Sequence, residues 1–364
     1  ANTSTLVASP NAVVANGTST ATLTFTAIDA YNNLVPGTAV SLSASGGNNT
    51  FGATSGTTNS SGIFTTTLAS TLAQFQTVTA SFGSTNTVTT SVQFVSGPAS
   101  ATTSSFVVSP NSTVANNSNV LTGFLTLLDA QKNALVGITP TFTASGTNTT
   151  ISSAGPTTGA GQTSATFSTP SAQNENILAA AGSLIFSVPV SFVAGPISQT
   201  SSSLVANPNA SYGNGTASVA LTTTARDAQG NAVSGAPVTL SASGGNNTFG
   251  ATSGTTTAAG TFATTLKSTI VQNETITATL NGNITESTSV NFAQGANLTK
   301  STFTVSATSQ TVGPSNSITA TVTLKDAQSN ALANIAPTWT ATGSNTTIAQ
   351  SGNTNASGVM LVPA

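Results

Sequence analysis

The sequence lacks the residues on which most enzyme and metal chemistry depends. It contains no cysteine, which excludes disulfides, thiolate metal sites and cysteine nucleophiles. It contains no histidine either, so a Ser-His-Asp triad is impossible. Neither a phosphate-binding loop nor a dinucleotide fingerprint occurs. We therefore expect a protein that is not an enzyme and that has no cofactor.

Charge is also scarce, with five basic and seven acidic side chains in 364 residues. Residues 1–100 contain a single charged side chain, Asp29. Nucleic-acid binding needs clustered basic residues, but those present are scattered, at Lys132, Arg226, Lys267, Lys300 and Lys325. No apolar run reaches the length of a membrane span. We expect neither nucleic-acid binding nor direct membrane insertion by this segment.

What the chain does contain is a repeat of about 98–100 residues. Each copy carries the pattern Asp-x-x-x-Asn, at Asp29 and Asn33, Asp129 and Asn133, Asp227 and Asn231, and Asp326 and Asn330. This period is the size of one independently folding sandwich domain. We predict four domains, at residues 1–97, 98–195, 196–295 and 296–364, of which the fourth is incomplete and lacks its last strands.

Apolar residues alternate with Thr and Ser within each repeat. In the first repeat the alternation covers residues 21–27, 40–44, 64–68, 78–82 and 88–94, with turn residues between these runs. A period of two with β-branched residues on the outer face is typical of half-buried antiparallel strands. About seven short strands per repeat predict an all-β fold of tandem immunoglobulin-like antiparallel β-sandwiches.

The repeats follow one another through short Gly or Gly-Pro links, at Gly97-Pro98, Gly195-Pro196 and Gly295. Links of this length do not act as flexible tethers, and proline stiffens two of them. We therefore expect a semi-rigid rod. The first and third repeats share 17 identical residues, Leu42 to Thr58 and Leu240 to Thr256, so the repeats alternate in an A-B-A-B order.

The aspartates of the repeated pattern are candidates for a structural turn motif. They occur once per domain, too far apart to pair for acid–base chemistry. Calcium prefers six to eight oxygen ligands with several carboxylates, which the first repeat cannot supply. The alternative is an Asx-type turn, in which the carboxylate accepts hydrogen bonds from backbone N–H groups beyond the strand end. We therefore predict no metal and no catalytic residue at these positions.

This pattern, followed by Gly or Pro and an alternating strand, resembles the bacterial immunoglobulin-like domains of the invasin and intimin family. The resemblance is clearest at Asp227-Ala228-Gln229-Gly230-Asn231-Ala232-Val233, whereas the glycine before Asn is replaced by Asn32, Lys132 and Ser329 in the other copies. It implies a stalk on the outer surface of a bacterium that holds an adhesive tip away from the cell.

Two structural functions remain open at this point. The first is a spacer or stalk of a surface adhesin. The second is a self-assembling surface-layer or filament subunit, favoured by a nearly uncharged surface and by few lysines to block strand edges. Nothing beyond variable loops supports a third function, a specific binding module. Expected partners are copies of the chain or other cell-surface proteins.

Both functions place the protein outside a bacterial or archaeal cell. Asn-x-Ser/Thr sequons, among them Asn48, Asn148, Asn246 and Asn345, could also carry glycans.

Overall fold

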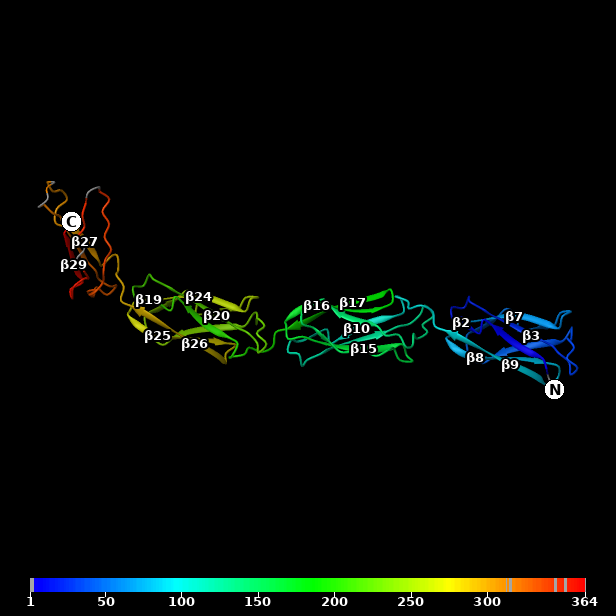
Figure 1. The fold of residues 1–364 in the computed structure, drawn as a ribbon. Coiled ribbons are helices and arrows are strands. Elements are labelled where there is room, and N and C mark those ends of the chain that lie inside the picture. Colours follow the sequence, from blue (N-terminus) through cyan, green and yellow to red (C-terminus); the bar gives the residue numbers. More distant parts are fainter. Residues whose placement is uncertain (1–2, 312, 314–315, 344–345, 350–351, 364) are drawn as a thin grey trace. The chain divides into compact units, whose positions relative to one another are not determined.

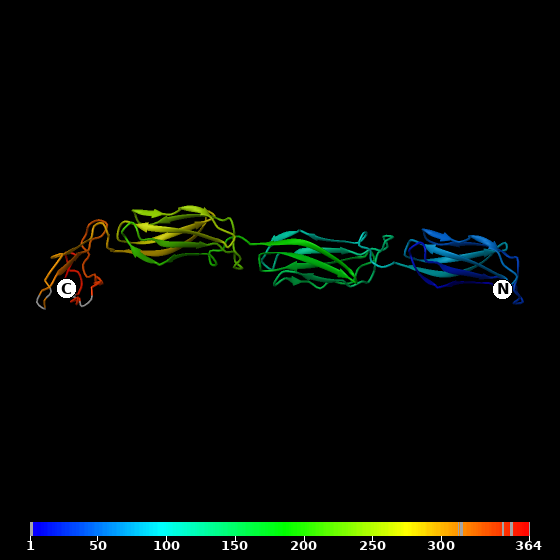
Figure 2. The same ribbon diagram turned by 90° about the horizontal axis from the view of Figure 1, so that it is seen from above.

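The structure is a computed structural model, and it describes residues 3–311, 313, 316–343, 346–349 and 352–363. The chain divides into two compact units, Ala1–Val193 and Ala194–Ala364. The described residues are all-β, as the alternation predicts. Figures 1 and 2 show the strands of each sandwich running side by side, with turns at the two ends.

The first unit contains two sandwiches. In the first sandwich, one sheet has the order β1 (Thr5–Ser9), β3 (Ala21–Thr26), β7 (Ile63–Ser70), β5 (Asn49–Phe51). The facing sheet has the order β2 (Ala12–Val14), β9 (Asn86–Val95), β8 (Gln74–Phe82), β4 (Ala39–Ala44), β6 (Ser55–Thr57). The second sandwich pairs β10 (Ser105–Ser109), β12 (Leu121–Thr126), β15 (Gln162–Ser168), β14 (Thr150–Ile151) in one sheet. Its other sheet contains β11 (Ser112–Val114), β17 (Leu184–Val193), β16 (Gln173–Ala181), β13 (Thr141–Ala144).

The second unit begins with a sandwich of the same topology. One sheet contains β18 (Ser203–Asn207), β20 (Val219–Thr224), β24 (Thr261–Ser268), β22 (Asn247–Phe249). The other contains β19 (Ala210–Tyr212), β26 (Ile284–Ala293), β25 (Gln272–Leu280), β21 (Pro237–Ala242), β23 (Ser253–Thr255). The described residues of 296–364 form one sheet of β27 (Thr302–Val305), β28 (Thr319–Thr323), β29 (Val359–Pro363).

One ladder in each complete sandwich departs from the antiparallel pairing that we predicted. Strands β2, β11 and β19 run parallel to β9, β17 and β26. Each follows a proline, Pro10, Pro110 or Pro208, that ends the preceding antiparallel ladder. Proline has no N–H to donate to that ladder, so the chain leaves the first sheet there and joins the second.

The alternating residues form one core per sandwich. In the first, Leu23, Phe25, Leu68, Val78 and Phe94 are each at most 2% exposed, and side chains of both sheets contribute. The second and third sandwiches have equivalent cores around Phe167 and Phe292. The Thr and Ser residues that alternate with these apolar residues form the polar face of each strand.

The sheet formed by β27, β28 and β29 has a more exposed aromatic residue than the second sandwich has at the equivalent place. Phe303 on β27 packs against Trp339 with ring centroids 5.8 Å apart, as Phe106 packs against Phe142 in the second sandwich. Phe303 is nevertheless 63% exposed, whereas Phe106 is 7% exposed. The same aromatic pair therefore lies on a more open face in the fourth repeat.

Candidate functional site

Each Asp-x-x-x-Asn segment forms the same turn. In the second sandwich, Asp129 Oδ1 accepts hydrogen bonds from the backbone N–H groups of Gln131 (2.9 Å) and Asn133 (2.8 Å). The Asp129 N–H in turn donates to the Asn133 carbonyl oxygen (2.9 Å). Asp29, Asp227 and Asp326 make the corresponding carboxylate bonds in the other copies. The carboxylate thus closes the loop after its strand.

The residue before Asn has a left-handed backbone in all four turns. Its φ is 72° at Asn32, 67° at Lys132, 84° at Gly230 and 67° at Ser329. Glycine adopts this conformation without steric cost, whereas Lys and Ser do not. The carboxylate bonds therefore hold the turn even where the sequence departs from glycine.

The second carboxylate oxygen accepts bonds from outside the turn in two copies, and in a third the Gln294 side chain hydrogen-bonds the Asp326 carboxylate. Asp129 Oδ2 accepts bonds from Asn133 Nδ2 (2.9 Å) and from the N–H of Gly97, in the link before the second sandwich (2.9 Å). Asp227 Oδ2 does the same with Asn231 Nδ2 (2.9 Å) and the N–H of Gly195 (2.8 Å). These two turns fasten the preceding link to the sandwich that follows it.

The turn of the first repeat is more open. Asp29 Oδ2 accepts a 3.1 Å bond from Asn33 Nδ2, and Asn33 is exposed. In contrast, Asp129 is 1% exposed and Asn133 is 6% exposed. The same pattern of residues therefore occupies two different environments.

Hydrogen bonding lowers the pKa of all four aspartates. At Asp29, bonds from the backbone and then the side chain of Asn33 lower the pKa. At Asp129 and Asp227, burial is the largest influence and raises the pKa, but the hydrogen bonds from Asn and the link glycine together outweigh it, so the pKa is lowered. Asp326 shows the same balance and the same lowered pKa.

The four aspartates lie in separate turns, and each carboxylate accepts hydrogen bonds from its own turn. Among the described residues, no group of three His, Cys, Asp or Glu gathers as metal ligands would. The groups that surround the Asp129 carboxylate are N–H donors, and an N–H donor is not a ligand for a cation. Such a turn can fix backbone positions.

A second repeated polar position escaped the sequence reasoning. Gln76, Glu175 and Glu274 occupy the same inward place on β8, β16 and β25, and each is at most 5% exposed. Glu175 Oε2 accepts a 2.8 Å bond from Thr149 Oγ1, and Glu274 Oε2 accepts a 2.6 Å bond from Asn247 Nδ2. The signal that could have found them is Gln-x-Gln/Glu before the alternating apolar residues of the strand.

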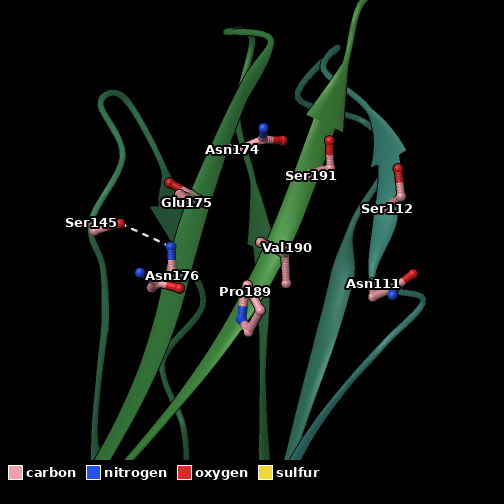
Figure 3. Close-up of a pocket in the computed structure, with 9 residues that line it drawn as sticks. All are labelled: Asn111, Ser112, Ser145, Asn174, Glu175, Asn176, Pro189, Val190 and Ser191. Atoms are coloured by element: carbon pink, nitrogen blue, oxygen red, sulfur yellow. Dashed lines mark hydrogen bonds between the residues drawn. The ribbon is translucent and has the colours of Figure 1, made fainter.

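A hollow lies on the outer face of the second sandwich beside Glu175 (Figure 3). Its lining is mainly of neutral Asn and Ser, and the Asn176 N–H donates a 2.8 Å bond to Ser145 Oγ. Glu175 itself is buried and bonded to Thr149. The lining provides hydrogen-bonding amides and hydroxyls, and Glu175 contributes its one carboxylate.

Three of the named sequons lie on exposed turns. Asn48, Asn148 and Asn246 are exposed, and each has a φ of 57°. Asn345 lies outside the described residues.

In the described part of the chain, no helix has the length and apolar character needed to span a bilayer.

Two-sheet sandwiches repeated in tandem, with the first strand split between the sheets, define a protein built of immunoglobulin-like domains. The profile of the family described as bacterial Ig-like domain (group 1) matches residues 3–95 and 201–293, which together are more than half of the chain. The chain therefore belongs to this family, as the Asp-x-x-x-Asn pattern suggested. No curated protein matches the sequence.

Several solved structures of bacterial proteins are similar to this fold. An invasin described as a bacterial integrin-binding protein matches with a TM-score of 0.53 and 17% identity, over 89% of this chain and 76% of that chain. FdeC, an Escherichia coli adhesin, matches with a TM-score of 0.50 and 25% identity, over 80% of this chain and 96% of that chain. InvD of Yersinia pseudotuberculosis gives a TM-score of 0.49 and 20% identity, over 80% and 97% of the two chains. The comparison with invasin supports the tandem immunoglobulin-like fold.

Proposed function

We propose that this chain is a non-enzymatic spacer of a bacterial surface adhesin. The observation that supports this most directly is the repetition of one family domain with its link fastened by an aspartate at Gly97 and Gly195. The similarity to FdeC, an adhesin, points in the same direction. Because the family is a bacterial one, the proposal is confined to the exterior of a bacterial cell.

Under this proposal the chain consists of four domains, at residues 1–97, 98–195, 196–295 and 296–364, which act together as a semi-rigid rod. The links support this, because a link bonded to the following sandwich cannot swing freely. The Asp-x-x-x-Asn turns then serve structure alone. The hollow that Glu175 helps to line is otherwise formed by neutral residues, mainly Asn and Ser.

One observation favours a second function, a subunit that assembles into a surface layer or filament. Twelve charged residues in 364 leave little repulsion between copies. Exposed apolar side chains such as Phe75 and Val107 could lie in contacts between copies. Partners would then be other copies of the chain, and glycans on Asn48, Asn148 or Asn246 would modify such contacts.

Electron microscopy of the purified chain at neutral pH, with and without calcium, tests these proposals. Isolated beaded rods at micromolar concentration are the result expected of a spacer. Sheets or filaments with a regular repeat would contradict the spacer and support assembly. A change of shape on adding calcium would contradict the metal-free interpretation of the turns.

A further inference from the structure

We propose that the Asp129–Asn133 turn is a joint that holds the second sandwich against the first. The turn then has a role between two sandwiches in addition to closing its own loop. The proposal rests on the proposed function only in that a spacer needs neighbouring sandwiches of limited mobility. Both sandwiches belong to the unit Ala1–Val193. In this joint, the side chain of Asn133 bonds to the backbone of the first sandwich.

Asn133 makes the contact across the two sandwiches. Its Oδ1 accepts a 2.8 Å hydrogen bond from the N–H of Ala73, and its Nδ2 donates a 3.0 Å bond to the carbonyl oxygen of Thr71. Both backbone groups belong to the short loop between β7 and β8 of the first sandwich. A single amide therefore satisfies one donor and one acceptor in a two-point contact, which fixes orientation as well as distance.

Asp129 holds Asn133 in place for this contact. Its Oδ2 accepts a bond from Asn133 Nδ2 and also from the N–H of Gly97, in the link between the sandwiches. A few residues further on, the Ser100 N–H donates a 2.9 Å bond to the Leu128 carbonyl oxygen. The link, the turn and the loop of the first sandwich are thus connected through one carboxylate and one amide.

Apolar packing is a weak alternative explanation for the contact. Next to the hydrogen bonds, a groove is lined by Leu72, Phe75 and Val136, which remain 39%, 72% and 60% exposed. Side chains that stay this exposed gain little from burial. Asn133 and Asp129, in contrast, are almost completely buried, so the polar bonds are the ordered part of the junction.

The chain provides its own control at Asn33. This residue occupies the same place in the same turn and donates the same bond to an aspartate. Its hydrogen bonds to Asp29 remain inside its own turn, and its side chain is exposed. Replacing Asn33 therefore removes the turn contribution alone, whereas replacing Asn133 removes the turn contribution and the joint.

The test is spin-label distance measurement in the full chain. Because the sequence has no cysteine, Thr89→Cys on β9 and Ser187→Cys on β17 give one label in each sandwich, both at exposed positions. We expect Asn133→Ala to broaden the distance distribution about twofold or more, because a two-point contact is lost. Asn33→Ala should leave the distribution unchanged.

A second measurement separates the joint from general destabilisation. Amide hydrogen exchange at Ala73 should become about tenfold faster in Asn133→Ala and stay unchanged in Asn33→Ala. An unchanged distribution together with unchanged exchange at Ala73 in Asn133→Ala would overturn the proposal. Equal broadening in both variants would also overturn it, because the turn alone would then explain the effect. Neither result bears on whether the chain is a spacer or assembles into a lattice.

Discussion

The hydroxyl of Thr58 donates a 2.7 Å hydrogen bond to the Val35 carbonyl oxygen and accepts a 2.9 Å bond from the N–H of Thr38. Thr58 is 4% exposed, and it ties the segment after the Asp29 turn to the end of β6. Equivalent threonines donate to the corresponding carbonyl oxygens in the other repeats, at Thr157, Thr256 and Thr354. A buried hydroxyl at this position is thus a second constant element of the repeat.

Replacing Thr58 by valine should therefore destabilise the first sandwich. The change keeps the shape but removes the hydroxyl from a part-buried N–H and from a carbonyl oxygen that Thr38 Oγ1 also reaches (3.3 Å), so we expect a cost of about 1 kcal/mol. Urea unfolding of the chain measures this as a lower midpoint for the first sandwich. Thr57→Val, at an exposed position on the adjacent residue, is the matched control and should change stability by less than about 0.5 kcal/mol. Equal effects of the two substitutions would contradict the role of the hydroxyl.

The buried position of Glu274 predicts a dependence on pH. Burial raises the pKa of this carboxyl, and the hydrogen bond from Asn247 only partly opposes the shift. A folded-state pKa above the unfolded one contributes stability that is complete at low pH and is lost as the pH rises through the folded value. Glu274→Gln should therefore raise the melting temperature at pH 7 and lose that advantage near pH 4.

Gln76 occupies the equivalent position in the first sandwich, which makes the substitution compatible with the fold. Calorimetric scans at the two pH values provide the measurement. A constant difference between wild type and variant at pH 4 and pH 7 would show that the ionisation of Glu274 has no influence.

The left-handed turn position gives a prediction about backbone strain. At Gly230, an added Cβ would meet no atom within 4 Å, so space is not the constraint there. Its φ of 84° nevertheless costs an alanine about 1 kcal/mol. Gly230→Ala should lower stability by this amount, and Lys132→Gly should relieve similar strain in the second sandwich. Thermal unfolding of the two variants is the check, and a loss of stability in Lys132→Gly would contradict it.

Damage to the core of one sandwich should unfold that sandwich and leave the others folded. Phe25 is fully buried and packs against Phe82, with ring centroids 4.8 Å apart. Phe25→Ala should cost about 3–5 kcal/mol and unfold the first sandwich. Tyr31→Ala, at a residue that is 87% exposed, should have little effect. Hydrogen exchange resolved by domain would show protection lost below residue 96 and retained at residues 203–293; loss across both ranges would contradict independent folding.

Much of this fold follows from period-two alternation. The runs predicted at residues 21–27, 40–44, 64–68, 78–82 and 88–94 correspond to β3, β4, β7, β8 and β9, with ends that differ by a few residues. The strands β1 and β2 were not predicted, because they are short and a proline separates them. Their parallel and antiparallel pairing depends on which sheet lies nearby, and alternation does not encode that.

The turns were predictable in chemistry but not in environment. A repeated Asp-x-x-x-Asn pattern indicates the carboxylate bonds that all four copies make. It does not distinguish Asn33 from Asn133, since both have the same local sequence pattern. One is exposed and the other bonds to Thr71 and Ala73, which lie about 60 residues earlier in the chain. Only the packing of one sandwich against the next decides between them.

The links bonded to the sandwich that follows them have a consequence for how such chains can grow. Gly97 and Gly195 each donate to an aspartate about 30 residues later, so connector and partner lie within one stretch of sequence. A gene duplication that copies one such stretch therefore copies the link together with the aspartate that holds it. Contacts such as those of Asn133 with Thr71 and Ala73, in contrast, depend on the sandwich that comes before.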